Sequence, residues 1–366
     1  MHSSILHTSF LIIITAGFSS ATTDLDILAG QHVIYSYPLT SQPPQQLLDL
    51  TRAGLVGGII LFGENIDANT SAAINSLRTA YAASPAPALL KKHTGKDAHL
   101  LITTDQEGGQ VRRIKNGEPK LSAKQIGSSP DPVATGKAAG GGAAQTLREY
   151  NLNANLAPVL DVYRKPGDFE DYYQRSFGNT SKMAIDAAVP FIRAQQAAGV
   201  AAAAKHFPGL GAASHEANTD ERPVTLDVSL SDLRTIDEDP YVAAIAAGVE
   251  MVMTSWAIYP SFDTLPAGLS SRWIKDELRG RLGFKGVTIT DAMEAGALKS
   301  FGSNAEVAVV AAKAGMDILL ASGRNVTQGD EIRTALVQGL QSGKLDSKEF
   351  DEATKRIVDM RSRLWA

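Results

Sequence analysis

The sequence contains no cysteine among its 366 residues. This absence excludes disulfide bridges, thiolate metal sites and a cysteine nucleophile. Blocks of lysine and arginine are also missing, and the formal net charge is -4. Nucleic-acid binding needs a basic patch, so we do not expect DNA or RNA as partners.

Several catalytic and cofactor motifs are missing as well. No G-x-G-x-x-G turn follows the first apolar run, which disfavours a dinucleotide-binding sheet. The motifs G-x-S-x-G, H-E-x-x-H and H-x-H do not occur in the chain. A serine hydrolase of the nucleophile-elbow type and a metal-dependent hydrolase are therefore not indicated. We expect neither a metal nor any other cofactor.

The amino terminus carries a candidate targeting segment. An apolar run from Phe10 to Phe18 precedes small residues at positions 19–21. The pattern is typical of a secretory signal peptide over residues 1–21, although no Lys or Arg precedes the apolar run. A buried first helix is the alternative. The run is too short to span a bilayer and no later stretch is long enough, so we expect a secreted protein without stable membrane insertion.

Eight short apolar runs alternate with longer segments of helical spacing. Continuous apolar runs are typical of parallel strands that are covered on both faces. Eight such units in about 300 residues favour the α/β class and a (β/α)8 TIM-type barrel, as a single domain over residues 22–366. The segment from Asp346 onward has the pattern of an amphipathic helix that closes the domain. The runs predicted as strands start at His32, Gly57, Leu100, Leu156, Ala201, Met251, Val287 and Asp317.

Polar residues stand where several of these runs end. The carboxyl ends of barrel strands surround one mouth, where binding and catalytic groups lie. We therefore expect these side chains to point into one site. Each acid taken alone is also explained as a helix cap or a ligand of loop amides. The polar residues at the strand ends are Asp105, Asp161, Lys205, His206, Ser255 and Asp291.

Several carboxylates around the mouth of one barrel are the groups that cleavage of a glycosidic bond requires. The oxocarbenium-like transition state needs a negative group at the anomeric face and a proton donor at the leaving oxygen. The residues therefore point to a carbohydrate substrate. A phosphorylase, and a secreted barrel that binds carbohydrate without cleaving it, stay open as alternatives.

The segments DQEGGQVRRI, KHFPGLG and TITDAMEAGAL, with others in the same order from about Gly54 onward, resemble glycoside hydrolase family 3. The likeness is to its single-domain β-N-acetylhexosaminidase branch. It implies the same barrel fold and an exo-acting, retaining hydrolase that removes terminal β-linked N-acetylglucosamine-type sugars through a covalent glycosyl-enzyme. A β-glucosidase of the same family is the alternative, although such enzymes usually add a second domain.

The resemblance also implies roles for single residues. Asp291 in TITDAMEAGAL matches the family's nucleophile. Asp161 is expected to support the sugar-binding network without touching sugar. The positions that match the family's sugar-binding residues are Asp105, Arg113, Arg175, Lys205 and His206.

The general acid/base is expected in the loop after KHFPGLG. In the best-known members of the branch this loop ends in D-S-H, whereas NTD, residues 218–220, stands in that place here. Asp220 is the first candidate, as a carboxylic acid with a pKa raised by its surroundings. His215, which follows a serine, is the second candidate, and Glu216 is the third. The Pro and Gly residues of the loop suit movement during protonation and product release.

Overall fold

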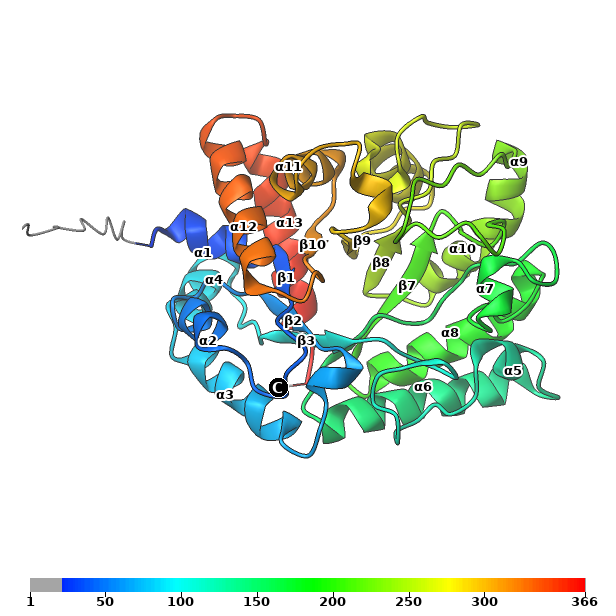
Figure 1. Cartoon of the computed structure of the whole chain (residues 1–366), viewed down its shortest axis with the longest axis horizontal. Coiled ribbons are helices and arrows are strands. Elements are labelled where there is room, and N and C mark those ends of the chain that lie inside the picture. Colours follow the sequence, from blue (N-terminus) through cyan, green and yellow to red (C-terminus); the bar gives the residue numbers. More distant parts are fainter. Residues whose placement is uncertain (1–21, 366) are drawn as a thin grey trace, which may run out of the picture.

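The structure is a computed structural model that describes residues 22–365. The predicted signal peptide, residues 1–21, lies outside the described residues. Eight parallel strands close into a barrel in the order β1-β10-β9-β8-β7-β6-β3-β2 (Figure 1). The predicted α/β barrel is therefore confirmed. Its strands are β1 (Val33–Tyr35), β2 (Gly58–Ile60), β3 (Leu101–Thr104), β6 (Ala154–Asn155), β7 (Ala201–Phe207), β8 (Met251–Thr254), β9 (Val287–Ala292) and β10 (Ile318–Leu320).

Helices connect the strands and surround the barrel (Figure 1). A small antiparallel pair, β4 (Gln106–Gly108) and β5 (Val111–Arg112), follows β3. No helix within residues 22–365 combines the length and the apolar character needed to cross a bilayer. The α-helices are α1 (Asp24–Gly30), α2 (Gln45–Arg52), α3 (Thr70–Ala82), α4 (Ala86–Thr94), α5 (Ala123–Gly127), α6 (Pro132–Glu149), α7 (Phe169–Tyr172), α8 (Ser181–Ala197), α9 (Leu230–Asp232), α10 (Asp239–Ala246), α11 (Asn304–Ala314), α12 (Val326–Gln341) and α13 (Ser347–Arg361). Helical turns of 3-10 or π type span Gly63–Asn65, Leu233–Asp237, Ala267–Leu269, Arg272–Arg281 and Gly296–Leu298.

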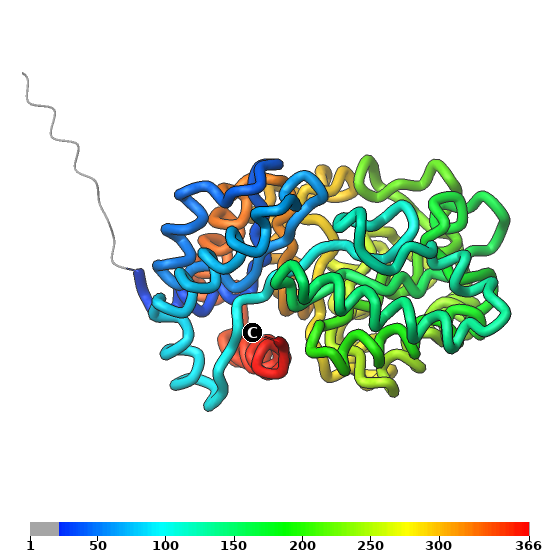
Figure 2. Tube along the Cα trace, turned by 90° about the horizontal axis from the view of Figure 1, so that it is seen from below, coloured from blue at the N-terminus to red at the C-terminus, as the bar shows by residue number. Residues whose placement is uncertain are grey.

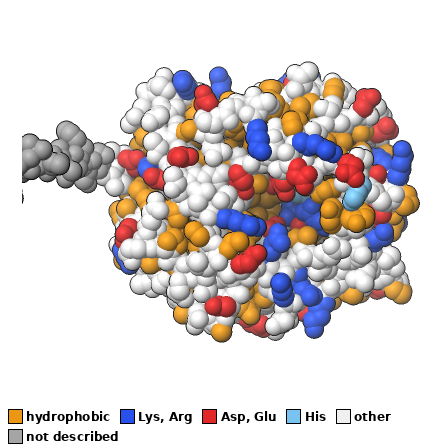
Figure 3. All heavy atoms as spheres, in the orientation of Figure 1, with side chains coloured by type: hydrophobic (Ala, Val, Ile, Leu, Met, Phe, Trp, Pro, Cys, Tyr) orange, Lys and Arg blue, Asp and Glu red, His pale blue; other side chains and the backbone are white. Residues whose placement is uncertain are grey.

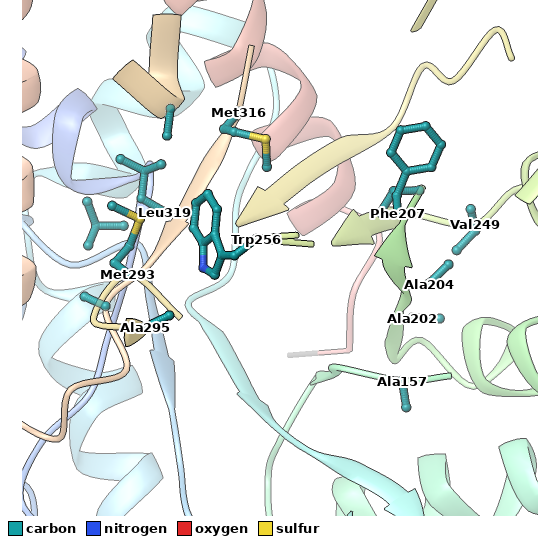
Figure 4. Close-up of a cluster of buried hydrophobic side chains, with 14 of the residues drawn as sticks. Ala157, Ala202, Ala204, Phe207, Val249, Trp256, Met293, Ala295, Met316 and Leu319 are labelled. Carbon is teal, nitrogen blue, oxygen red and sulfur yellow. The ribbon is translucent and has the colours of Figure 1, made fainter. Parts of the chain in front are cut away.

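The strands bury both of their faces. Successive side chains of a strand point to opposite sides. In β7, Ala201 and Ala203 belong to the apolar cluster inside the barrel. Ala202 and Ala204 belong to the layer between strands and helices, where Figure 4 shows them with Ala157. This double burial explains why the strand runs are apolar without polar alternation.

The fourth predicted strand differs from the structure. Regular pairing covers only β6, and the run from Leu156 onward continues as irregular chain beside β7. Pro158 interrupts the ladder because it has no N–H to donate. The run nevertheless flanks β7, since Lys205 N donates to Pro158 O at 3.2 Å and Leu160 N donates to Lys205 O at 2.6 Å.

Helix α13 closes one end of the barrel, as its amphipathic pattern predicts. Ile357 and Met360 of this helix, with Leu364 after it, lie in the same apolar cluster as the inward-facing strand residues. In the view from below in Figure 2, α13 (red) lies between the blue and green parts of the trace. The barrel is therefore sealed by side chains at its amino-terminal end.

A buried arginine anchors this seal. Arg361 is fully buried. Its guanidinium donates to His99 O at 2.6 Å, to Gln31 Oε1 at 2.9 Å and to Tyr81 Oη at 2.7 Å. A buried charge is tolerated only when its donors are satisfied, so these three neutral acceptors hold the end of α13 in place.

Candidate active site

Charged side chains replace apolar ones at the carboxyl ends of the strands. In β9, Val287 and Ile289 face the barrel interior, and the next residue at this spacing is Asp291. In β7, the interior residue Ala203 is followed at the same spacing by Lys205. Because alternate residues share a face, the apolar layers of the barrel are capped by a charged layer.

A cavity of about 710 Å³ opens at this end of the barrel. Figure 3 shows a hollow near the middle of the face, with acidic and basic side chains at its rim and floor. The strand ends and the loops after them therefore meet at one concave site. The predicted site residues that line the cavity are Asp105, Arg113, Arg175, Lys205, His206, Asp220 and Asp291.

Two other strand-end residues turn away from the cavity, so the prediction that all of them point into one mouth is wrong for these two. Asp161 is 1% exposed and lies behind His206, accepting hydrogen bonds from His206 N at 3.2 Å and Leu210 N at 2.7 Å. Ser255 is 1% exposed, and its Oγ accepts from Ala257 N at 2.9 Å. Both side chains instead satisfy nearby backbone N–H groups, as short polar side chains often do.

A buried ion cluster forms the floor of the cavity. Lys205 Nζ lies 2.9 Å from Asp105 Oδ1 and 2.8 Å from Glu107 Oε1. The Arg175 guanidinium donates hydrogen bonds to both carboxylate oxygens of Glu107, at 2.9 and 2.8 Å, and to Glu170 Oε1 at 3.0 Å. Bidentate pairing of this kind fixes the planes of both side chains. The floor is therefore a rigid array of charges.

The cluster favours the charged forms of Asp105, Glu107 and Lys205. Burial opposes ionisation of Asp105, but the positive charges of Lys205 and Arg113 outweigh it and lower the pKa of Asp105. Burial likewise opposes ionisation of Glu107, yet Arg175 and Lys205 hold its pKa well below the usual range. Burial lowers the pKa of Lys205, and the two carboxylates more than reverse that effect. Charged donors and acceptors suit the hydroxyl groups of a sugar.

Two acids of this cluster, Glu107 and Glu170, were not predicted from the sequence. Glu107 lies on β4, which the pairing with β5 folds back at the end of β3. Glu170 lies in α7 and is fully buried. Burial raises the pKa of Glu170 to about 7, with Arg175 opposing the shift and Asp161 adding to it. The available signal was that both acids stand within five residues of predicted site residues.

Asp161, Glu170 and His206 offer ligand atoms within 4.8 Å of one another, a spacing within which a metal ion could bind. His206 Nδ1, however, lies only 2.7 Å from Asp161 Oδ2. Two ligands of one zinc ion, each about 2 Å from it at tetrahedral angles, stand more than about 3 Å apart. The short distance fits a shared proton, and these atoms as placed do not fit a common metal ion.

The loop after β7 reaches the cavity through backbone hydrogen bonds to the segment that follows Asp291. Gly296 N donates to Asp220 O at 2.7 Å, and Ala297 N donates to Thr219 O at 3.0 Å. A Cβ at position 296 would lie 2.0 Å from a backbone oxygen of the loop. Glycine therefore permits the close approach that places Asp220 beside Asp291.

Asp220 has the properties of a proton donor. Asn218 Oδ1 accepts from Asp220 N at 3.0 Å, which is an Asx-turn that fixes the backbone there. The residue is open to solvent at the mouth, but the cavity walls desolvate its carboxyl group. Desolvation first and the negative charge of Asp291 second raise the pKa of Asp220 to about 6. A carboxyl group with this pKa suits general acid/base chemistry.

The other two loop candidates lie outside the lining of the cavity. The side chain of His215 is 42% exposed and packs on Tyr172, with 4.0 Å between the ring centroids. His215 Nδ1 lies 3.1 Å from Glu216 Oε1, and the side chain of Glu216 is 79% exposed. The geometry favours Asp220 over both, and the choice among the three stays a prediction.

Comparisons with known proteins bear on the family and the fold of the chain. Residues 31–360 match the glycosyl hydrolase family 3 N-terminal domain. A protein of Arthroderma benhamiae, named an uncharacterized secreted glycosyl hydrolase, is 51% identical over 344 residues, which cover 94% of this chain and 95% of that protein. A β-hexosaminidase of Xanthomonas axonopodis pv. citri is 33% identical over 300 residues, covering 78% of this chain and 84% of the relative.

Solved structures share the fold. A glycoside hydrolase family 3 β-N-acetylglucosaminidase from Paenibacillus sp. matches with a TM-score of 0.83 and 30% identity over 93% of this chain. This chain spans 62% of that protein's length. A β-N-acetylhexosaminidase from Beutenbergia cavernae matches with a TM-score of 0.78 and 29% identity, covering 93% of this chain and 99% of that one. The chain therefore belongs to glycosyl hydrolase family 3.

Proposed function

We propose that the protein is a retaining, exo-acting hydrolase that removes terminal β-linked N-acetylglucosamine-type sugars. The observation that carries the proposal is the pairing of two carboxyl groups, Asp291 at the end of β9 and Asp220 on the loop held against it, above a charged floor. The Xanthomonas relative is named a β-hexosaminidase and the Paenibacillus structure a β-N-acetylglucosaminidase. These names support the choice of sugar.

Each carboxyl group has one role in each of two steps. Asp291 attacks the anomeric carbon and forms a glycosyl-enzyme, while Asp220 gives its proton to the leaving oxygen. Asp220, now ionised, then takes a proton from a water molecule that attacks the same carbon. Asp291 leaves, the sugar departs in the β configuration, and Asp220 is protonated again.

The floor holds the terminal sugar. Asp105 accepts from hydroxyl groups, and Lys205 and Arg113 donate to sugar oxygens. Burial lowers the pKa of His206, but Asp161 more than offsets this effect and raises it, and His206 lines the cavity. The side chains of Lys205 and Glu107 are only 3% and 5% exposed. Both side chains line the cavity at its floor, where the terminal sugar is proposed to lie.

The test compares 4-nitrophenyl N-acetyl-β-glucosaminide with the corresponding β-glucoside. We expect the N-acetyl sugar to be preferred and its turnover to be lost in Asp291→Ala. Preference for the glucoside would favour the β-glucosidase alternative. Turnover that requires phosphate would favour the phosphorylase, and binding of sugar without turnover would favour the carbohydrate-binding barrel.

Retention is tested separately by proton NMR of the first product. We expect β-N-acetylglucosamine to form first and to mutarotate later. Early appearance of the α-anomer from a β-glycoside would refute the covalent step on Asp291, because inversion needs no glycosyl-enzyme.

We also propose that residues 1–21 direct secretion. The segment has the apolar run and small residues of a signal peptide, and the Arthroderma relative is named a secreted protein. Amino-terminal sequencing of protein collected from the medium is expected to begin near residue 22. Intracellular retention of the uncleaved chain would contradict this proposal.

A further inference from the structure

Four aromatic rings form a continuous strip that leads out of the cavity. Phe169 and Tyr173 line the cavity. The ring centroids of Phe169 and Tyr173 are 5.0 Å apart, those of Tyr173 and Tyr172 are also 5.0 Å apart, and those of Tyr172 and His215 are 4.0 Å apart. We call Phe169, Tyr173, Tyr172 and His215 the aromatic strip. Its inner end belongs to the site and its outer end lies on the surface.

The outer part of the strip is exposed. Tyr172 is 55% exposed and Tyr173 is 37% exposed, so both belong to the few large apolar residues on the surface of the described chain. In Figure 3 hydrophobic side chains and a histidine border one side of the hollow. Rings that contact one another at the rim of a polar cavity, in place of apolar residues scattered singly, indicate a binding surface.

The proposed role of Asp220 places the strip on the leaving-group side of the cavity. Phe169 N donates to Ala213 O at 2.9 Å, which ties α7 to the loop that carries Asp220. His215, at the outer end, belongs to that same loop. Because the acid protonates the oxygen of the leaving group, the part of the substrate beside this loop is the leaving group and not the terminal sugar that the floor holds.

We propose that the aromatic strip binds the pyranose ring of the sugar that leaves, so that the substrates are β-linked oligosaccharides of N-acetylglucosamine type. The inference rests on the proposed function and deepens it. A pyranose ring in which most substituents are equatorial presents C–H groups on its faces. The negative face of an aromatic ring attracts such C–H groups, and the contact excludes water from both surfaces.

The strip also gives His215 a role other than acid catalysis. Its imidazole packs on Tyr172, and Glu216 Oε1 lies 3.1 Å from its Nδ1. The pair with Glu216 orients the ring at the end of the strip. His215 thus extends the aromatic surface by one ring, outside the residues that line the cavity.

The experiment compares two substrates that differ only in the leaving group. Methyl N-acetyl-β-glucosaminide and N,N'-diacetylchitobiose both leave a poor alkoxide that needs protonation, but only chitobiose offers a second sugar ring. In Tyr172→Ala we expect kcat/KM for chitobiose to fall about threefold to tenfold, the effect of one aromatic contact, while kcat/KM for the methyl glycoside changes less than twofold. Tyr172→Phe, which keeps the ring, serves as the matched control and stays near the wild type for both.

The outcomes separate this inference from the proposed function. Equal losses on both substrates in Tyr172→Ala, or no loss on chitobiose, would overturn the role of the strip while leaving the hydrolase intact. Failure of the wild-type protein to hydrolyse either substrate would refute the proposed function. In that case calorimetric binding of chitobiose against N-acetylglucosamine still tests the strip, since Tyr172→Ala is expected to weaken only the disaccharide.

Discussion

Both ends of the barrel contain buried charged side chains, but the partners of these side chains differ between the two ends. At the end sealed by α13, Arg361 is fully buried and is matched by oxygen atoms of neutral groups. At the open end, Lys205 is matched by the carboxylates of Asp105 and Glu107. At the sealed end the charged side chain holds α13 in place, whereas at the open end the charged side chains face a cavity. Stability and chemistry are thus separated along the barrel axis, as the fold permits.

The largest expected effect is the loss of turnover when the proposed nucleophile at the open end is removed. Asp291→Ala is expected to lower kcat for 4-nitrophenyl N-acetyl-β-glucosaminide by about 10⁴-fold or more, because no other group takes the place of the nucleophile. Added azide is expected to restore part of the turnover and to give the α-glycosyl azide, identified by NMR. An unchanged thermal unfolding midpoint serves as the control, and retention of substantial activity would contradict the assignment.

The next effect depends on the leaving group. Asp220→Ala is expected to lower kcat/KM for the methyl glycoside by about 10³-fold, since general acid catalysis contributes about 10²-fold to 10⁴-fold. An activated dinitrophenyl glycoside needs no proton and is expected to lose much less in the glycosylation step, measured as kcat/KM. His215→Ala is the matched control. The same dependence on the leaving group in His215→Ala, and not in Asp220→Ala, would transfer the role to His215.

A substitution at the sealed end is expected to leave the chemistry intact. Arg361→Ala removes the guanidinium and leaves the buried acceptor oxygens of His99, Gln31 and Tyr81 without their hydrogen-bond donor. We expect the free energy of unfolding to fall by about 3–5 kcal/mol, because each buried acceptor left without its donor costs about 1–3 kcal/mol. Urea unfolding gives the change, and kcat/KM of the folded fraction is expected to stay at the wild-type value. A loss below about 1 kcal/mol would show that the seal does not depend on Arg361.

The smallest expected effect is a shift in pH dependence. In the proposed mechanism Asp220 acts in its protonated form, and its pKa is raised to about 6, so kcat/KM is expected to fall as the pH rises through about 6. Part of that pKa comes from the negative charge of Asp291. In Asp291→Asn, which removes the charge, the pKa of Asp220 is therefore expected to fall, as measured by carbon-13 NMR of labelled Asp. An unchanged value would mean that Asp291 does not act on Asp220 through its charge.

Much of the open end is predictable from the sequence because the barrel strands have a period of two. Once Val287 and Ile289 are placed inside, Asp291 must point to the same side, and the same argument places Lys205 after Ala203. Asp161 breaks the rule because Pro158 interrupts its strand before the carboxyl end. Glu107 and Glu170 were missed because a short hairpin and a single helical turn place them, and such elements are too short to leave a periodic signal.

The pairing of the first and last strands also limits how the chain reaches this structure. Ile34 of β1 pairs with Leu320 of β10, and the interior is covered only when α13 docks against it. Contacts between such distant parts of the chain form slowly, because a long loop must close before they contribute to stability. During synthesis the barrel stays open until nearly the whole chain is available. A chain that stalls before α13 therefore leaves the apolar interior of the barrel uncovered at one end, and exposed apolar surface is the feature by which chaperones and proteases distinguish unfinished chains from folded ones.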